Sequence, residues 1–271
     1  FVWMVEFDSD HLLAGASTDI DNGDDFTMTN RAIKTFNFNG GANSGPLGTA
    51  EFLTGFDLFE DKDQVEVDFL IAPGMTSTID QTTIVNDLVA TAQQTRKDCV
   101  VVTSPARDDI VNLTSAATIN TNVIATANTF TNSSYLIMDG NYLKTYDKYN
   151  DQFITIPAAS STAGICAATD LNRAAWFSPA GQRRGQYLGI TALAYSPNKS
   201  QRDALYRNDV NPIANIPGQG TILFGDKTML GRPSAFDRIN VRRLFLILEI
   251  FVNFLQVVEK DLFHPIIYLI F

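Results

Sequence analysis

Side chains that could support acid–base, nucleophilic or metal chemistry are scarce in this sequence of 271 residues. Its two histidines, His11 and His264, lie far apart along the chain, and no Gly-x-Ser-x-Gly motif presents a serine nucleophile. Cys99 lies in an apolar run and Cys166 in an alanine-rich segment, so we expect two buried, inert thiols. The sequence therefore predicts neither a catalytic triad nor a histidine-based metal site.

Two segments resemble ligand-binding loops but lack residues that binding requires. Residues 19–25 are acidic, yet placing Gly23 at the sixth position of a calcium-binding EF-hand loop puts Ile20, which cannot ligate, at the third. Residues 218–220 read Gly-Gln-Gly, but Leu223 stands where a dinucleotide-binding fingerprint has its third glycine. We expect an exposed acidic turn and an ordinary loop, with no cofactor and no metal.

Charged residues are unevenly distributed along the chain. The formal net charge is −10, which argues against a general nucleic-acid binder. Residues 1–70 hold fourteen acidic side chains against three basic ones, whereas residues 173–243 hold eleven basic against four acidic. The asymmetry has two interpretations: surfaces that simply differ, or oppositely charged surfaces that match between copies of the same chain.

Two arginine pairs and a tryptophan are the candidate contact residues. Arg183-Arg184 and Arg242-Arg243 could form a solvated face, or could bind carboxylates of a neighbouring subunit in a forked geometry. Trp176 could belong to the core beside a tight turn, or could anchor an interface. We treat all five as candidate inter-subunit contacts.

The elements that must position these residues indicate an α/β fold, α+β overall. Apolar runs at 65–71, 99–102 and 135–138 are typical of strands, and 80–97 and 108–128 have helical character. This alternation predicts a parallel sheet with right-handed helical crossovers. The surrounding elements are expected to be a strand at 1–7, a hairpin within 142–156, a helix over 158–173, a long loop around 179–185, a helix over 200–207 and a strand over 222–224.

Three parts are expected along the chain. Residues 1–63 are predicted to be the β-rich, incomplete portion of an outer domain, 64–215 an α/β domain, and 216–271 the truncated start of a C-terminal core domain. The stretch 244–271 is very apolar, but Glu249, Glu259, Lys260 and Asp261 interrupt any membrane helix. We expect a buried helix or, over 250–271, a non-native tail. Because Phe1 opens a strand-like segment, we expect a piece of a longer protein.

Four sequence blocks, in order, resemble a known family. Residues 174–185, Ala-Ala-Trp-Phe-Ser-Pro-Ala-Gly-Gln-Arg-Arg-Gly, are similar to the W-x-x-P-A-G-x-x-R-G block of contractile tail sheath proteins of myoviruses, in particular those of T4-like phages. Asn-Pro-Ile at 211–213 with Gly-Gln-Gly at 218–220, Phe-Gly-Asp-Lys-Thr-Met-Leu at 224–230 and Ile-Asn-Val-Arg-Arg-Leu at 239–244 follow as in that family. The family's N-terminal arm is missing, and the likeness fades after Glu249.

The resemblance implies a structural role and no enzymatic activity. It implies a subunit that polymerises helically around a tail tube, moves as a rigid body, and contracts from a kinetically trapped extended state to drive the tube through the host envelope. The implied partners are other copies of the sheath protein, the tail tube protein, and the baseplate and tail terminator proteins, with no nucleic acid or membrane. The implied location is the virion, with the host cytoplasm during assembly.

Two other classes of protein stay open on the residues alone. A doubly wound α/β enzyme domain would bind a small ligand at the carboxyl ends of its strands. A receptor-binding or decoration module would use the β-rich start. The strand ends, however, lead into Pro73-Gly74, Ser104-Pro105 and Asp139-Gly140, without a glycine-rich cradle or a clustered acid–base pair.

Overall fold

The computed structural model describes residue 45 and residues 47–252. Residues 47–252 belong to one compact unit, which begins at Leu47. The strand expected at 1–7, the acidic turn at 19–25, both histidines and most of the candidate tail at 250–271 lie outside the described residues.

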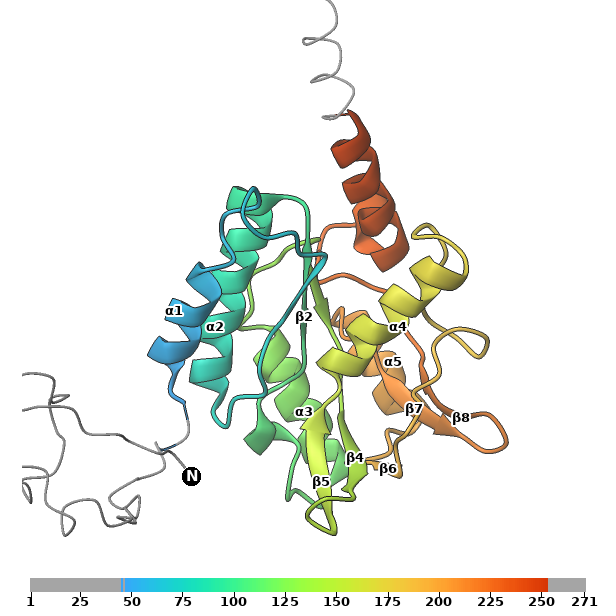
Figure 1. Cartoon of the computed structure of the whole chain (residues 1–271). Coiled ribbons are helices and arrows are strands. Elements are labelled where there is room, and N and C mark those ends of the chain that lie inside the picture. The colour runs from blue at the N-terminus through green and yellow to red at the C-terminus, as the bar shows by residue number, and fades with distance from the viewer. Residues whose placement is uncertain (1–44, 46, 253–271) are drawn as a thin grey trace, which may run out of the picture. The chain divides into compact units, whose positions relative to one another are not determined.

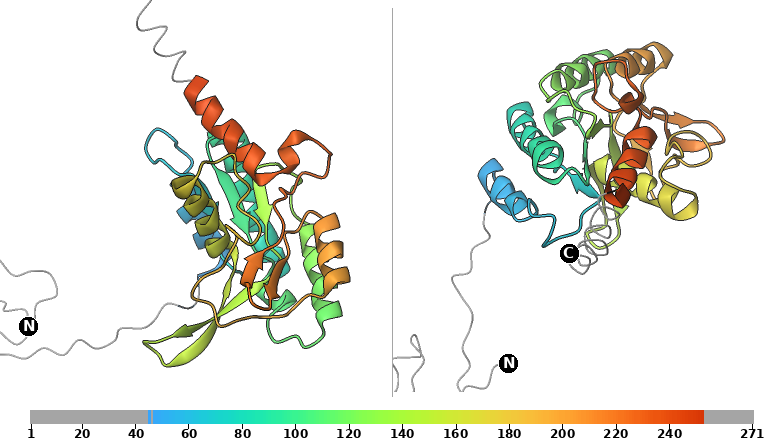
Figure 2. Two further views of the ribbon diagram at one scale, coloured as in Figure 1. Left: turned by 90° about the vertical axis from the view of Figure 1, so that its right-hand side faces the viewer. Right: turned by 90° about the horizontal axis from the view of Figure 1, so that it is seen from above.

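The centre of the fold is a parallel sheet of three strands. β1 (Phe69–Ile71), β2 (Val100–Thr103) and β3 (Leu136–Met138) lie in the order β1-β2-β3 and are parallel, as predicted. Every residue of β2 and β3 is buried, which is expected for strands covered on both faces. Helices α2 and α4 both pack against β2, and they lie on opposite sides of it in Figure 1 and in the view from above (Figure 2, right).

The helices follow the predicted alternation, with shifted boundaries. α2 (Thr78–Ala90) continues into a π-helical turn, Thr91–Arg96, and together they match the helix expected over 80–97. α3 (Ala116–Ala127) begins later than the expected residue 108, because the Ser115 hydroxyl caps it by accepting a hydrogen bond from the Thr118 amide.

The remaining helices flank this centre. α4 (Ala159–Asn172) and α5 (Lys199–Arg207) agree with the predicted segments, and α3 packs beside α5. A further helix begins at residue 239 and continues to residue 252, the last described residue. Among the described residues, no helix combines the length and apolar character needed to cross a bilayer.

The expectation that residues 1–63 are β-rich is wrong for their described part. Residues Thr49–Asp57 form the helix α1, which packs on α2. Phe52, Leu53 and Phe56 give it one apolar face against the core, and the Glu51 carboxylate accepts a hydrogen bond from the Gly48 amide at its start. The compact unit begins at Leu47, before the domain border expected at residue 63.

Antiparallel pairs complete an α+β fold. β4 (Tyr142–Asp147) and β5 (Gln152–Pro157) form the predicted hairpin, and β6 (Ala192–Leu193) pairs with β4. β7 (Ile213–Ile216), which was not predicted, pairs with β8 (Gly220–Leu223). The domain border expected between residues 215 and 216 therefore falls inside a paired strand, so these residues belong to the same structural element.

Candidate assembly surface and its anchoring junction

The loop between α4 and β6 is fastened to β8 by main-chain hydrogen bonds. The Gly181 amide donates to the Leu223 carbonyl at 2.9 Å, and the Leu223 amide donates to the Gly185 carbonyl at 2.7 Å. A Cβ atom at Gly185 would lie 2.9 Å from the Gly181 nitrogen, and Gly181 itself has φ +93°. The spacing of glycines in the block 174–185 thus follows from a tightly folded loop that side chains would disrupt.

The Asp226 carboxylate joins this loop to the start of the helix 239–252. The Ser178 hydroxyl donates to Asp226 Oδ2 at 2.9 Å, and Arg238 Nη1 donates to Asp226 Oδ1 at 2.5 Å. Arg238 also donates to the Tyr206 hydroxyl of α5 at 2.6 Å. The hydrogen bond to Asp226 raises the pKa of the Arg238 guanidinium above its ordinary value. The loop and the start of the helix meet at this one carboxylate, and α5 joins them through Arg238. We call this arrangement the Asp226 junction.

Two further hydrogen bonds join the start of the helix 239–252 to the loop and to Asp226. Asn240 Nδ2 donates to the Trp176 carbonyl at 2.9 Å, and the Ile239 amide donates to the Asp226 carbonyl at 2.8 Å. Asn240 and Ile239 open the Ile-Asn-Val-Arg-Arg-Leu block, whereas Trp176 opens the loop motif. Two sequence blocks separated by more than fifty residues are therefore in direct contact.

Asn211 connects the same junction to the parallel sheet. Its fully buried amide donates to the Met138 carbonyl of β3 at 3.1 Å and to the Lys227 carbonyl at 2.7 Å, and its Oδ1 accepts from the Lys227 amide at 2.7 Å. A Cβ atom at Gly225 would lie 2.7 Å from Asn211 Oδ1. The Asn-Pro and Phe-Gly-Asp-Lys blocks are thus in direct contact, through hydrogen bonds and through close packing at Gly225.

In the structure, the side chains of Arg242 and Arg243 contact residues of their own chain. Arg243 is 5% exposed and donates to the Asp170 carboxylate and the Cys166 carbonyl of α4. The Arg242 guanidinium lies 4.0 Å from the ring centre of Tyr135 and donates to the Ser134 hydroxyl. Burial lowers the pKa of both guanidinium groups. Both arginines anchor the helix 239–252 to the body of the domain.

The other three candidates lie together on the outside. Trp176 is 57% exposed and stacks on Phe177, with 6.3 Å between ring centres. The Arg184 guanidinium lies 5.4 Å from the Phe177 ring centre, and its Nε donates to the Ser178 carbonyl at 2.7 Å. Arg183 is exposed, with no carboxylate within 4.0 Å among the described residues. We call Trp176, Phe177, Arg183 and Arg184 the aromatic–arginine surface.

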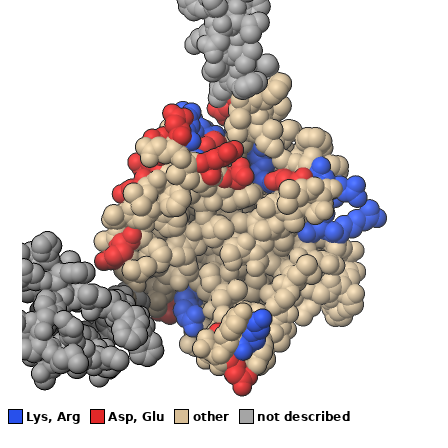
Figure 3. Space-filling view, viewed as in Figure 1, with Lys and Arg blue, Asp and Glu red and all other residues tan. Residues whose placement is uncertain are grey.

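Acidic residues gather on another part of the molecule. The last residue of α1 and the segment that follows it have Lys62 as their one basic residue. They carry six exposed carboxylates: Asp57, Glu60, Asp61, Asp63, Glu66 and Asp68. We call residues 57–68 the acidic loop. Figure 3 shows acidic side chains gathered at the upper left, where this loop lies, and basic side chains at the right, beside the end of α4. Loss of hydration, with repulsion from Asp57 and Glu60, raises the pKa of the nearby Asp87 carboxyl.

The acidic loop is held by an arginine that the sequence did not mark as a candidate. Arg96 is 2% exposed and donates to the Phe59 carbonyl at 2.7 Å and to the Val65 carbonyl at 2.9 Å. Its position in the π-helical turn points the guanidinium back over the loop. No local sequence signal distinguishes this arginine from a surface residue at a helix end.

Polar groups at the carboxyl end of the sheet are buried and bonded to one another. Asp139 has no exposed surface and accepts hydrogen bonds from the hydroxyls of Ser104 at 2.8 Å and Thr162 at 3.1 Å, and Thr162 also bonds to Tyr187. Burial raises the pKa of the Asp139 carboxyl to about 7. These groups fasten α4 to the sheet and are not accessible to a ligand of the kind that an enzyme of this topology would bind there.

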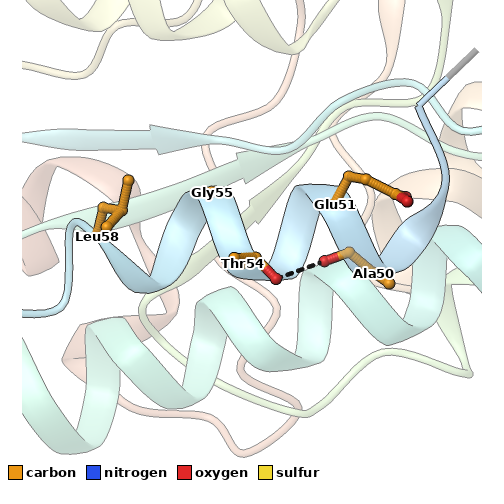
Figure 4. A pocket seen from close by; sticks show the side chains of 5 residues that line it. All are labelled: Ala50, Glu51, Thr54, Gly55 and Leu58. Carbon is orange, nitrogen blue, oxygen red and sulfur yellow. Dashed lines mark hydrogen bonds between the residues drawn. The ribbon is translucent and has the colours of Figure 1, made fainter. Parts of the chain in front are cut away.

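A shallow hollow lies on the outer face of α1. Its volume is about 430 Å³, and it is lined by Ala50, Glu51, Thr54, Gly55 and Leu58 (Figure 4). The Thr54 hydroxyl donates within the helix to the Ala50 carbonyl at 3.0 Å, and Glu51 bonds to the Gly48 amide. Because one helix supplies the entire lining and its polar groups bond locally, we assign it no ligand.

Comparison with known proteins identifies the class. The family described as phage tail sheath protein, central domain, matches residues 45–229. The tail sheath protein of Enterobacteria phage T4 is 38% identical over 220 residues, which cover 78% of this chain and 33% of the relative. The tail sheath protein of Vibrio phage KVP40 is 38% identical over 228 residues, which cover 79% of this chain and 34% of the relative.

Solved structures share the fold at low sequence identity. The sheath of an extracellular contractile injection system, PVC, in the contracted state has a TM-score of 0.57 and 20% identity, covering 74% of this chain and 50% of that one. The helical sheath of the anti-feeding prophage in the contracted state has a TM-score of 0.54 and 18% identity, covering 73% and 48%. The fold is therefore that of contractile-sheath proteins.

The chain belongs to the phage tail sheath protein family, as the four sequence blocks predicted. It spans about a third of the length of the curated relatives it matches.

Proposed function

We propose that this chain forms the central part of a contractile tail sheath subunit. Such subunits would polymerise helically around a tail tube and contract to drive the tube through the host envelope. The family match over residues 45–229 carries this proposal. The convergence of the diagnostic sequence blocks at the Asp226 junction supports it, because it gives those blocks a structural purpose within one domain.

The role is mechanical rather than enzymatic. A sheath subunit must transmit force between its neighbours without deforming, and closely packed interiors transmit strain because they compress little. Three features favour rigidity here: the doubly covered sheet, the buried Asp139 cluster and the Asp226 junction. Contraction would then rearrange contacts between subunits while each central domain moves as a rigid body.

The proposed partners follow from this role. They are other copies of the sheath protein, the tail tube protein, and the baseplate and tail terminator proteins. The proposed location is the phage tail in the virion, with assembly in the host cytoplasm. We further propose Trp176, Arg183 and Arg184 as contacts between subunits, whereas Arg242 and Arg243 serve inside the domain.

A chimera tests the proposal. Residues 45–229 would replace the matching region of the tail sheath protein of Enterobacteria phage T4, and negative-stain electron microscopy would compare the chimera with the unmodified relative under the same assembly conditions. Tubular polymers of similar diameter are the expected result. A chimera that is folded by circular dichroism yet never forms tubes, while the relative does, would contradict the proposed function.

A further inference from the structure

We propose that the aromatic–arginine surface docks the acidic loop of a second copy of this chain. The inference rests on the proposed function, since it names the partner of the proposed contact residues. It specifies both sides of one contact: Trp176, Phe177, Arg183 and Arg184 on one copy, and residues 57–68 on the next.

The aromatic–arginine surface is built to receive carboxylates. Its base is fixed, because the loop is tied to β8 and to the Asp226 junction. Trp176 and Phe177 offer stacked, partly exposed rings, and Arg184 lies over Phe177. Arg183 extends from this base with no acidic partner among residues 47–252. Rigid aromatic residues beside arginine are the composition enriched at the centres of protein interfaces.

The acidic loop has the matching properties. Arg96 holds its backbone at two carbonyls, so the loop loses little conformational freedom when it binds. Six exposed carboxylates follow one another closely in its sequence, and like charges at such short spacing repel one another. Cations from another molecule would relieve this repulsion. Lys62 is the one basic side chain that the loop itself provides.

The acidic loop continues from α1 and the aromatic–arginine surface belongs to the loop after α4. Because α1 and α4 lie on opposite sides of β2 (Figure 1), each copy can offer both surfaces at once. A contact between unlike surfaces is heterologous, and when its rotation does not close a ring it generates an open helical polymer. A second copy therefore fits both the charge of the surface and the symmetry of a sheath. An isologous dimer in which the aromatic–arginine surface contacts its own copy would instead place like charges against each other.

Sedimentation velocity of the 271-residue chain tests the contact. At about 20 mM salt the weight-average sedimentation coefficient should rise with protein concentration. At about 500 mM salt this rise should disappear, because the Debye length shortens and salt screens the attraction between the two charged surfaces. Arg183→Glu should weaken self-association about tenfold. Arg207→Glu, the same change at an exposed position on α5, is the matched control and should have little effect.

A charge swap makes the test specific. A chain carrying Asp61→Lys and Asp63→Lys should stay monomeric alone, as should the Arg183→Glu chain, but the two mixed should associate in alternation. A mixture that stays monomeric, equal effects of Arg183→Glu and Arg207→Glu, or a wild-type chain that shows no salt-dependent association would overturn the docking proposal. The tubes expected of the chimera would be unaffected by any of these results, so the failure of this contact can be told from failure of the proposed function.

Discussion

The Arg96 guanidinium and the Asp98 carboxylate form a forked ion pair, in which Nε and Nη2 each lie 3.0 Å from a carboxylate oxygen. The fork fixes the plane of the guanidinium, and the remaining donors then reach the carbonyls of Phe59 and Val65. A planar guanidinium can satisfy all four contacts, and a lysine ammonium cannot. One buried arginine thus determines where the acidic loop sits.

Arg96→Lys should therefore destabilise the domain by about 1–3 kcal/mol, because partly buried carbonyl and carboxylate groups lose hydrogen-bond partners. Urea unfolding followed by circular dichroism measures the change. Arg207→Lys, at an exposed position at the end of α5, is the control and should stay within about 0.5 kcal/mol of the wild type. Equal free energies of unfolding for the two variants would show that the forked contacts of Arg96 do not stabilise the domain.

Disrupting the Asp226 junction should locally reduce the protection of backbone amides against hydrogen exchange. Asp226→Asn removes the charge that binds Arg238, so amide hydrogen exchange should speed up around residues 176–181 and 237–240 together. Global stability should fall by about 1–3 kcal/mol. Asp203→Asn, an exposed change on α5, should leave exchange in both segments unchanged. If only one segment responds, the loop and the helix are not coupled through this carboxylate.

Asp139 should make the domain less stable as the pH rises. Its folded-state pKa of about 7 lies above the ordinary value of 3.8, so the folded state holds the proton more tightly than the unfolded state. The corresponding contribution to the free energy of unfolding, on the order of 4 kcal/mol, is present below pH 4 and is lost between pH 4 and pH 7.

Asp139→Asn should remove this dependence, so the difference in unfolding free energy between pH 5 and pH 8 should shrink relative to wild type. Asp203→Asn is again the control and should preserve the difference. A pH profile that is identical in wild type and Asp139→Asn would show that the carboxyl does not titrate in this range.

Both thiols should be unreactive in the folded protein. Burial raises the pKa of Cys99 to about 12 and that of Cys166 to about 11, so thiolate is scarce near neutral pH. At pH 8 an aromatic disulfide reagent should modify neither cysteine on the time scale of minutes, and both should react at once in denaturant. Rapid labelling of the native protein would show that the cores around α4 and β2 open readily.

The sequence predicted the parallel sheet and the β4–β5 hairpin because each strand carries a local signal. β2 begins with three consecutive valines, and the hairpin turns at Asn150-Asp151, where Asp151 takes a positive φ. The Asp226 junction has no such signal. Its contacts join residues up to 48 positions apart. Tertiary packing decides which groups bind a carboxylate, and the periodic spacing of apolar residues in the sequence carries no information about it.

The arginine pairs show the same limit within one motif. Arg242 and Arg243 are adjacent, but neighbouring positions on a helix point about 100° apart. Arg243 is therefore buried against α4, whereas Arg242 lies over Tyr135. The sequence marked these arginines as candidates, yet it could not separate Arg183 and Arg184, which lie on the outer loop, from Arg242 and Arg243, which hold the domain together.

The most direct test of the proposed mechanical role is a cryo-electron-microscopy comparison, in the extended and contracted states, of a second chimeric sheath that carries residues 45–252 of this chain. The described residues 47–252 should form part of the sheath wall in both states. Their Cα positions should superpose within about 1 Å, with the Asp226–Arg238 pair intact and only the contacts between subunits changed. A domain that refolds between the two states, or a junction that opens on contraction, would contradict the claim that this chain works as a rigid subunit.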